Sequence, residues 1–289
     1  MYSPILSLLL MGVLPFQGGT SPGESPIGRV RIAPPAPTAS VSPDGRVFSG
    51  LQLSASGVLI IDHQSGQSLF AKEDRTPRPM ASLTKIMTAL LIAERHTMDE
   101  WVTIPSEVHG VGGESIHLEP GQQFLVSDLL SAMLIGSAND AAVALAIYHS
   151  GSLEAFVAAM NIRARELGLL NTSYQNPVGF DAEMQLSTPQ DIAWLTMFAL
   201  RSLEIRRRMG MRGATFKSRS GDTVTVTHTH ALLHAESGVI VGKTGTTPGA
   251  QQCLLSVVTG SNGREYIVVL LRSLNRYADM RAIIRALAS

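Results

Sequence analysis

Strand-like segments stand at both ends of this 289-residue chain with helical patterns between them, and this order constrains the fold more than any other feature. Near the start, two short apolar runs flank Gln64-Ser65-Gly66, which predicts a β-hairpin. Near the end, apolar strand-like runs return and a helix closes the chain. A sheet of such segments is assembled from distant parts of the chain and carries a helical insertion. We therefore expect an α+β fold, an antiparallel sheet flanked by helices.

Apolar periodicity sets the expected bounds of each element. The hairpin strands are expected over Val58 to Asp62 and Gln67 to Ala71, and a helix is expected over Ala81 to Glu94. Further helices are expected over Val126 to Ile135, Asp140 to Tyr148, Leu153 to Leu167 and Thr188 to Leu200. The later strands are expected over Thr223 to Thr227, Gly238 to Val241, Cys253 to Val258 and Tyr266 to Leu271, and the last helix over Arg276 to Ala288.

The N-terminus has the composition of a targeting segment. Ile5 to Phe16 is nearly unbroken apolar sequence, as long as the apolar part of a signal peptide and too short to span a bilayer. No Lys or Arg precedes it and no A-x-A cleavage site follows, so an uncleaved anchor is the alternative. We expect a signal peptide over residues 1–19, a Pro/Gly/Ser-rich linker over 20–50, and a folded domain over 51–289 with its helical insertion at about 97–213.

Charge and composition narrow the class of partner and cofactor. Lys and Arg total 23, as do Asp and Glu, so the chain lacks the basic footprint expected of a nucleic-acid-binding protein. The single cysteine, Cys253, lies in an apolar run and is expected to be a buried strand residue. The eight histidines show no metal-ligand spacing, and His228 and His230 are expected on a solvated strand face. We predict no metal and no cofactor.

Ser82 and Lys85 form an S-x-x-K element at the start of the first expected helix. Residues three apart share a helix face, so the lysine amine can reach the serine hydroxyl. A serine needs a neighbouring base to become a nucleophile, and a lysine serves if desolvation and a second cation lower its pKa. A helix N-terminus also favours a developing oxyanion. Taken alone, the spacing is better explained by a helix with an N-terminal serine and a solvated lysine.

Two more elements follow in order, S-x-N at Ser137 and Asn139, and K-T-G at Lys243, Thr244 and Gly245. The first fits a proton relay and a hydrogen bond to substrate backbone, or simply a helix break. In the second, the cation of Lys243 and the hydroxyls of Thr244 and Thr246 could hold a substrate carboxylate, and the edge of the strand could pair with an extended substrate. The alternative is a plain strand end. The order of the three elements, each in its expected setting, favours one catalytic site.

The surrounding sequence resembles the low-molecular-mass penicillin-binding proteins, the serine D-alanyl-D-alanine carboxypeptidase family. The resemblance is carried by Pro79 to Leu90, Gly136 to Ala142, Asn176 to Asp181, Ser187 to Asp191 and Gly242 to Thr247, and it covers roughly residues 55–285. It implies a β-lactamase/transpeptidase-like fold over the catalytic domain 51–289.

The resemblance also implies a reaction. Ser82 would attack the carbonyl between the last two D-alanines of a peptidoglycan stem peptide, with Lys85 as base, and water would resolve the acyl-enzyme. The oxyanion would be held by the backbone N–H groups of Ser82 and Thr246. Arg276 would help to bind the substrate carboxylate. β-Lactams would acylate the same serine, and the protein would act outside the cytoplasm, in the periplasm or cell-wall space.

Departures from the family pattern leave alternatives open. The chain stops after the catalytic domain, so no C-terminal membrane anchor is expected. His228-Thr229-His230 replaces the usual Asn-x-Asn before K-T-G. Shorter family members include D,D-endopeptidases that cut cross-links. A β-lactamase would need a carboxylate to activate water, for which the region after Asn171 offers Asp181 and Glu183. A non-catalytic sensor of β-lactam or peptidoglycan is the last alternative.

Overall fold

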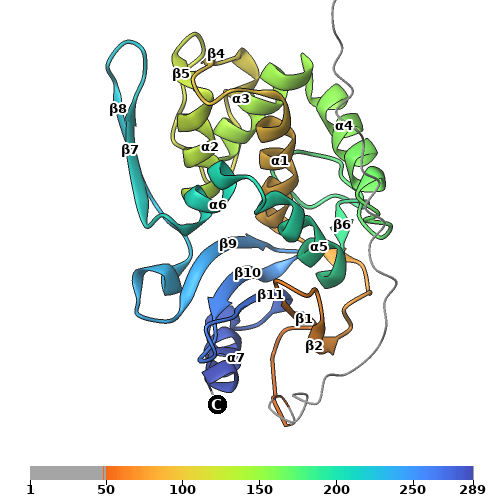
Figure 1. Ribbon diagram of the computed structural model, residues 1–289. Coiled ribbons are helices and arrows are strands. Elements are labelled where there is room, and N and C mark those ends of the chain that lie inside the picture. The colour runs from red at the N-terminus through yellow and green to blue at the C-terminus, as the bar shows by residue number, and fades with distance from the viewer. Residues whose placement is uncertain (1–47, 49, 289) are drawn as a thin grey trace, which may run out of the picture. The chain divides into compact units, whose positions relative to one another are not determined.

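The computed structural model describes residue 48 and residues 50–288 (Figure 1). The expected signal peptide, and the expected linker apart from residues 48 and 50, lie outside this part of the chain. A five-stranded antiparallel sheet is the framework, in the order β2-β1-β11-β10-β9. Its strands are β1 (Gly57–Asp62), β2 (Ser68–Lys72), β9 (Val239–Thr247), β10 (Gln251–Thr259) and β11 (Glu265–Ser273).

The first and last strands of the chain are neighbours in this sheet. β1 pairs with β11 so that Ile60 lies opposite Val268, although some two hundred residues separate them in the chain. This pairing confirms that the sheet is assembled from distant segments. β9 is an edge strand, so one side of its backbone is left unpaired by the sheet.

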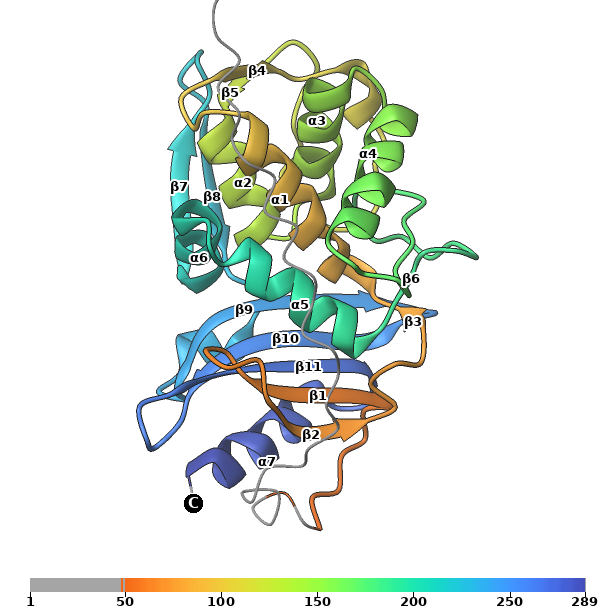
Figure 2. The ribbon, with the colours of Figure 1, turned by 45° about the vertical axis from the view of Figure 1, so that its right-hand side comes forward.

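Both faces of the sheet are buried, which explains the nearly continuous apolar strands. Successive side chains on a strand point to opposite faces, and Val58 and Ile60 accordingly pack in one apolar cluster while Leu59 and Ile61 pack in another. The first cluster is closed by the final helix α7 (Arg276–Ala288), and the second by the helical layer (Figure 2).

The helical layer contains most of the expected helices. Its members are α1 (Lys85–Arg95), α2 (Val126–Ile135), α3 (Asn139–Ser150), α4 (Leu153–Glu166), α5 (Pro189–Ala199) and α6 (Leu203–Gly210). The bounds of α2 and α7 are those the sequence predicts. Helix α6 was not predicted, because its buried residues are only Ile205, Arg208 and Met209 and most of its surface is polar.

The expected helix from Ala81 to Glu94 needs a correction. Residues Ala81–Thr84 form a 3₁₀ turn, η2, and the α-helix begins only at Lys85. Ala81 adopts a positive φ of 48°, which an α-helix does not allow. Ser82 therefore stands in the tight turn that leads into α1 and not in the first turn of the α-helix.

Short two-stranded ladders complete the structure. β3 (Arg78–Pro79) pairs with β6 (Leu186–Ser187), and β4 (Trp101–Thr103) pairs with β5 (Gln123–Leu125). β7 (Gly213–Lys217) pairs with β8 (Thr223–Thr227), but only β8 was predicted. Two further 3₁₀ turns are η3 (Ser106–Val108) and η4 (Ala231–His234).

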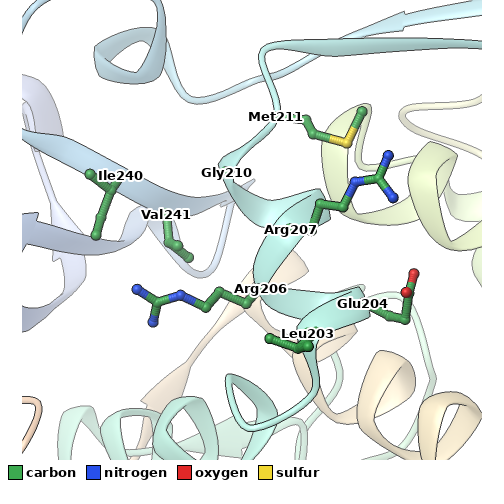
Figure 3. A pocket seen from close by; sticks show the side chains of 8 residues that line it. All are labelled: Leu203, Glu204, Arg206, Arg207, Gly210, Met211, Ile240 and Val241. Atoms are coloured by element: carbon green, nitrogen blue, oxygen red, sulfur yellow. The ribbon is translucent and has the colours of Figure 1, made fainter.

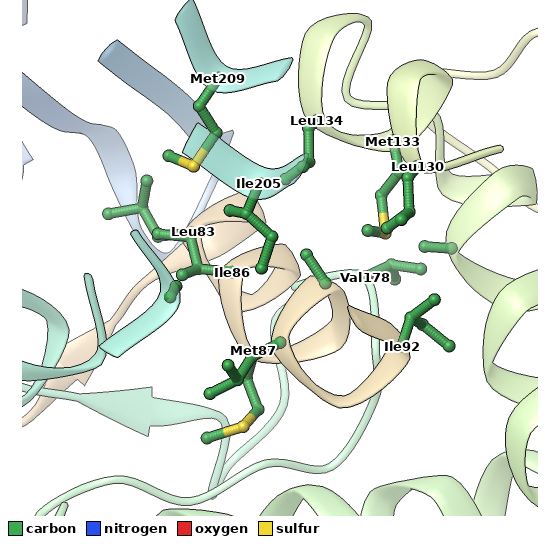
Figure 4. Packing of buried hydrophobic residues seen from close by; sticks show 14 of the residues in the cluster. Leu83, Ile86, Met87, Ile92, Leu130, Met133, Leu134, Val178, Ile205 and Met209 are labelled. Atoms are coloured by element: carbon green, nitrogen blue, oxygen red, sulfur yellow. The ribbon is translucent and has the colours of Figure 1, made fainter. Parts of the chain in front are cut away.

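Helix α1 lies at the centre of the helical layer. All residues from Lys85 to Ile92 are buried, so the helix is enclosed on every side. Figure 4 shows Ile86 and Leu83 facing Ile205 and Met209 of α6, with side chains of α2 and Val178 nearby. Because α1 is packed all round, its N-terminal end, where Ser82 and Lys85 stand, is held at a fixed place above the sheet.

Replacing Ile86 with Ala should destabilise the protein by about 2–5 kcal/mol, since the side chain is fully buried and its removal leaves a cavity. Urea unfolding measures this change. Leu170→Ala is the matched control, because Leu170 is 82% exposed and its loss should change stability by less than about 0.5 kcal/mol. Equal effects of the two variants would contradict the central packing of α1.

Candidate active site

Three separate chain segments meet where the helical layer lies against edge strand β9. Ser82 and Lys85 come from η2 and the start of α1, Ser137 and Asn139 from the break between α2 and α3, and Lys243 from β9. Hydrogen bonds join the three segments, Lys85 to Asn139 and Lys243 to Ser137. The structure thus brings together the three elements that the sequence singled out.

The amine of Lys85 lies beside the hydroxyl of Ser82. Its Nζ is 3.1 Å from Ser82 Oγ, and it donates to Asn139 Oδ1 at 2.6 Å and to the carbonyl of Val178 at 2.7 Å. A neutral amine has two N–H donors and one lone pair. With both donors engaged by Asn139 and Val178, the lone pair remains for the Ser82 hydroxyl, which is the arrangement that a general base requires.

The surroundings of Lys85 favour the neutral amine. Lys85 is fully buried, and burial lowers its pKa well below the ordinary value, with the nearby charge of Lys243 lowering it further. The carboxylates of Glu114 and Asp140 act in the opposite direction but do not outweigh the burial. Lys85 can therefore accept a proton at a pH where an exposed lysine is fully charged.

Ser137 links the second segment to Lys243. Lys243 Nζ donates to Ser137 Oγ at 2.8 Å and to the carbonyl of Thr244 at 3.1 Å. Ser137 has a positive φ of 62°, a strained conformation for a residue with a side chain. The break between α2 and α3 holds this strain and aims the Ser137 hydroxyl at β9.

Lys243 is also fully buried, and its pKa falls to about 7. Burial is the main cause and the positive charge of Arg276 adds to it, while Glu114 opposes both. Around neutral pH, Lys243 therefore exchanges readily between the cation and the neutral amine.

Glycines allow β9 to lie directly against the turn that carries Ser82. A Cβ atom on Gly245 would lie 2.8 Å from Ser82 N and 2.9 Å from Ala81 Cβ. On the other side, Gly179 has a φ of 99°, and a Cβ there would lie 2.0 Å from the carbonyl oxygen of Ala81. The backbone of Ser82 thus lies between two chain segments that approach it without side chains.

Arg276 contacts the end of β9. Its Nη1 donates to the carbonyl of Gly245 at 3.0 Å and to Thr246 Oγ1 at 2.8 Å. Thr244 is tied to the neighbouring segment, because its hydroxyl lies 2.6 Å from that of Thr229. Arg276 therefore binds Gly245 and Thr246, whereas the preceding residue of β9, Thr244, is bonded to Thr229.

His228 and His230 require a correction, since they were expected on a solvated face. They are only 4% and 0% exposed. The His230 ring packs against Gly242 and bonds Ser256 Oγ at 2.8 Å. Burial lowers the pKa of each to about 3. The second cause is the positive charge of Lys243 for His228 and that of Arg276 for His230. Both histidines are therefore neutral. This segment forms a packed wall behind Lys243.

Several groups that the site uses had no predicted role. The carbonyl of Val178 binds Lys85, and the hydroxyl of Thr229 binds Thr244. The charge of Glu114, on the loop before α2, raises the pKa of both lysines against the effect of burial. A carbonyl acceptor leaves no sequence signal, since every residue has one, and Glu114 belongs to no motif that the sequence analysis recognised.

Asp181 and Glu183, the two carboxylates considered for a β-lactamase, lie in different surroundings. Asp181 accepts from Thr247 Oγ1 at 2.6 Å and from Gly249 N at 2.8 Å, so its carboxylate braces the turn between β9 and β10. Glu183 is exposed. Neither has a contact with Ser82 or Lys85 among the hydrogen bonds of the described residues.

An open pocket lies apart from this site, between α6 and the first half of β9 (Figure 3). Leu203, Arg206 and Arg207 of α6 line one side, and Ile240 and Val241 of β9 line the other. None of the candidate site residues lines it. We therefore locate the candidate active site at Ser82 and not at this pocket.

The fold is that of the penicillin-recognising transpeptidases. The crystal structure of the Streptomyces K15 DD-transpeptidase matches this chain with a TM-score of 0.77 and 28% identity, over 82% of this chain and 97% of that one. A family model described as D-alanyl-D-alanine carboxypeptidase, peptidase S11, matches residues 40–273. The chain belongs to this family.

Curated relatives carry two kinds of name. D-alanyl-D-alanine carboxypeptidase DacF of Bacillus subtilis is 35% identical over 81% of this chain and 61% of its own length, and DacC of Escherichia coli is 31% identical over 81% and 60%. A D-alanyl-D-alanine endopeptidase of Pseudomonas aeruginosa is 30% identical over 81% and 77%. The chain spans about three fifths of the length of the two carboxypeptidases.

Gly245→Ala should slow acylation of the protein by benzylpenicillin by at least about tenfold, because the added methyl group would push β9 away from Ser82 N. Stopped-flow or quenched-time mass spectrometry measures the rate. Gly112→Ala is the control, since Gly112 lies on a neighbouring loop with open space around its Cβ position. A normal rate in Gly245→Ala would contradict the required close approach.

Lys243→Met should stabilise the fold by roughly 1–4 kcal/mol at pH 6. The folded-state pKa of about 7 lies below the ordinary 10.5, so the folding cost of the buried charge is fully present below pH 7. Between pH 7 and 10.5 only the unfolded chain holds the proton, the wild type gains stability, and the advantage of the variant shrinks. Urea unfolding at pH 6 and pH 9 tests this, with exposed Lys217→Met as control. A gain that does not change with pH would contradict the argument.

Proposed function

We propose that this protein is a serine D-alanyl-D-alanine carboxypeptidase that acts on peptidoglycan stem peptides through an acyl-enzyme. The observation that carries the proposal is the contact between the Lys85 amine and the Ser82 hydroxyl, at 3.1 Å, with both amine donors engaged elsewhere. Membership of the carboxypeptidase family supports the choice of substrate.

Acylation begins with attack of Ser82 Oγ on the carbonyl between the two D-alanines, while Lys85 Nζ accepts the hydroxyl proton. The carbonyl oxygen becomes an oxyanion, which the backbone N–H groups of Ser82 and Thr246 stabilise. Two observations support this hole. Ser82 N lies in the close contact between η2 and β9 at Gly245, and Thr246 follows Gly245 on the same strand.

The leaving D-alanine needs a proton on its amine. The proton on Lys85 reaches it with Ser137 as the relay, since Ser137 Oγ is held in the site by Lys243 of β9. The terminal carboxylate of the substrate is bound by the cationic Lys243, the hydroxyls of Thr244 and Thr246, and Arg276. Asn139, while holding Lys85, offers its amide to the substrate backbone.

Deacylation repeats these steps with water as the nucleophile. Lys85 is again neutral after the amine leaves, so it can take a proton from water that attacks the Ser82 ester. The product is the shortened stem peptide, and Ser82 regains its proton. β-Lactams, which carry an acyl group of similar shape, acylate Ser82 by the same first step.

A substrate in the cell wall places the protein outside the cytoplasm, which agrees with the signal peptide expected at residues 1–19. Within residues 50–288, no single helix is long and apolar enough to cross a bilayer. Among the helices of the described residues, α3 and α4 reach that length and composition only when taken together, and they are bent by 84° at the break between them.

Cleavage of peptidoglycan cross-links is the second candidate function. It is favoured by the match to the endopeptidase of Pseudomonas aeruginosa, of which this chain covers a larger share than of the two carboxypeptidases. The chemistry at Ser82 is unchanged, and the leaving group becomes the amine of a second stem peptide. Release of that peptide from a cross-linked dimer distinguishes this activity from release of D-alanine.

Ser82→Ala should abolish both formation of a penicilloyl adduct and release of D-alanine from a stem pentapeptide. Intact-protein mass spectrometry after incubation with benzylpenicillin measures the first, and a D-alanine assay measures the second. Exposed Ser106→Ala is the control and should behave as the wild type. An adduct on Ser82→Ala would exclude Ser82 as the nucleophile. A wild type that consumes penicillin repeatedly without an adduct would favour a β-lactamase.

A further inference from the structure

The loop of residues 175–185, which precedes β6, is bonded to the first half of α1. The carbonyl of Pro177 accepts from Thr88 Oγ1 at 2.8 Å. The carbonyl of Val178 accepts from Lys85 Nζ at 2.7 Å and so occupies one N–H of the proposed base. The conformation of this loop therefore decides which way the Lys85 amine faces.

Gln185, at the end of this loop, fixes the place where the loop begins. Its side chain is only 2% exposed, and all four hydrogen-bonding positions of its amide are used. Oε1 accepts from Gln175 N at 2.6 Å and from Asn176 N at 3.1 Å, and Nε2 donates to the carbonyl of Asn176 at 3.3 Å. Nε2 also donates to Thr84 Oγ1 at 2.9 Å. Gln185 thus ties the start of the loop to the turn η2.

Asn176 extends this order to the carbonyl that binds Lys85. Its Oδ1 accepts from the backbone N–H groups of Val178 at 3.3 Å, Gly179 at 2.7 Å and Phe180 at 3.0 Å. Because Gln185 holds both the N–H and the carbonyl of Asn176, it fixes the residue on which the Val178 backbone depends.

Thr84 extends the order in the other direction, to the turn that presents Ser82. Thr84 is fully buried, and its hydroxyl accepts from Gln185 while it donates to the carbonyl of Ala81 at 2.8 Å. Ala81 has a positive φ of 48°, a conformation that persists only where the surroundings hold it. Gln185 is therefore linked to the base through the loop and to the nucleophile through η2.

We propose that Gln185 is a positioning residue that holds the Lys85 amine and the Ser82 hydroxyl in the orientation needed for proton transfer. The inference rests on the proposed function, because it concerns the first step of the same reaction. Without the bonds of Gln185, the Val178 carbonyl is free to move away from Lys85. The amine can then rotate so that an N–H, and not its lone pair, faces Ser82 Oγ. Acylation is slowed, whereas ligand binding, in which Gln185 has no proposed part, is unchanged.

Acylation by benzylpenicillin at increasing concentrations separates these two effects, because it gives a limiting rate and a half-saturating concentration. Gln185→Met keeps the length of the side chain and removes its four hydrogen bonds. We expect the limiting rate to fall about tenfold to hundredfold and the half-saturating concentration to stay within about twofold. Gln175→Met is the matched control, since Gln175 is an exposed glutamine of the same loop that accepts only from Met184 N. Its limiting rate should stay within about twofold of the wild type.

A pair of variants at Thr84 tests the link to η2 separately. Thr84→Val keeps the shape of the side chain and loses the hydroxyl, whereas Thr84→Ser keeps the hydroxyl. We expect a limiting rate at least about threefold lower in Thr84→Val, and one within about twofold of the wild type in Thr84→Ser. Urea unfolding checks that each variant is folded in the assay. If Gln185→Met does not fold, the Thr84 pair decides.

Four results would overturn the inference. A wild-type limiting rate in Gln185→Met would mean that Gln185 has no part in the proton transfer, while the proposed function stands. A raised half-saturating concentration at an unchanged limiting rate would mean that it acts on binding. An equal loss in Gln175→Met, or a Thr84→Ser as slow as Thr84→Val, would mean that the proposed bonds are not what matters. If the wild type formed no adduct and released no D-alanine, the proposed function would fail, and the inference with it.

Discussion

Two lysine side chains, Lys85 and Lys243, are fully buried in the same region of the protein. Removing an ammonium group from water is costly, and two of them near each other raise the cost further. The surrounding groups keep the pair in place, with Asn139 and the carbonyl of Val178 on Lys85 and with Ser137 on Lys243. Burying the pair makes the fold less stable, but it also lowers the pKa of Lys85. The neutral amine that results can accept a proton from Ser82, which is the property that a Ser-Lys nucleophile needs.

The architecture can be understood as the support for this pair. Helix α1 is enclosed by the other helices, so the amine of Lys85 has little freedom to move. Strand β9 brings Lys243 in from the other side, and Gly245 lets the two elements touch. Positive φ angles at Ala81 and Ser137 occur at the two turns that aim the site hydroxyls. Strain of this kind persists only where the surrounding packing determines the backbone conformation, as it does here.

The sequence predicted elements and motifs well where the signal is local. The bounds of α2, β8 and α7 follow from apolar periodicity, and the S-x-x-K spacing places Lys85 beside Ser82. Features that depend on tertiary contact were missed or wrong. The 3₁₀ turn at Ala81 follows from the close approach of Gly179 and Gly245, two segments far away in the chain.

Burial and charge at the site were harder still to predict. His228 and His230 alternate with threonines as residues of a solvated strand would, but both are buried, and the His230 ring packs against Gly242 and bonds Ser256. Glu114 belongs to no motif that the sequence analysis recognised. Its loop lies at the site because Asn139 and Asp140 form hydrogen bonds with it. Such relations come from hydrogen bonds to backbone, which any residue type can supply.

The two buried lysines respond differently to substrate binding in the proposed reaction. Lys243 has a pKa of about 7, so in the empty site it carries only part of a positive charge near neutral pH. A substrate carboxylate placed beside it would raise that pKa and complete the charge. A fully charged Lys243 lowers the pKa of Lys85 further, since the charge of the first acts directly on the second. The negative charge of the bound carboxylate acts on Lys85 in the opposite direction, as the carboxylates of Glu114 and Asp140 do, so the pair that it forms with Lys243 is nearly neutral. The low pKa of Lys85 in the complex then rests mainly on its burial, which the fold supplies before any substrate binds.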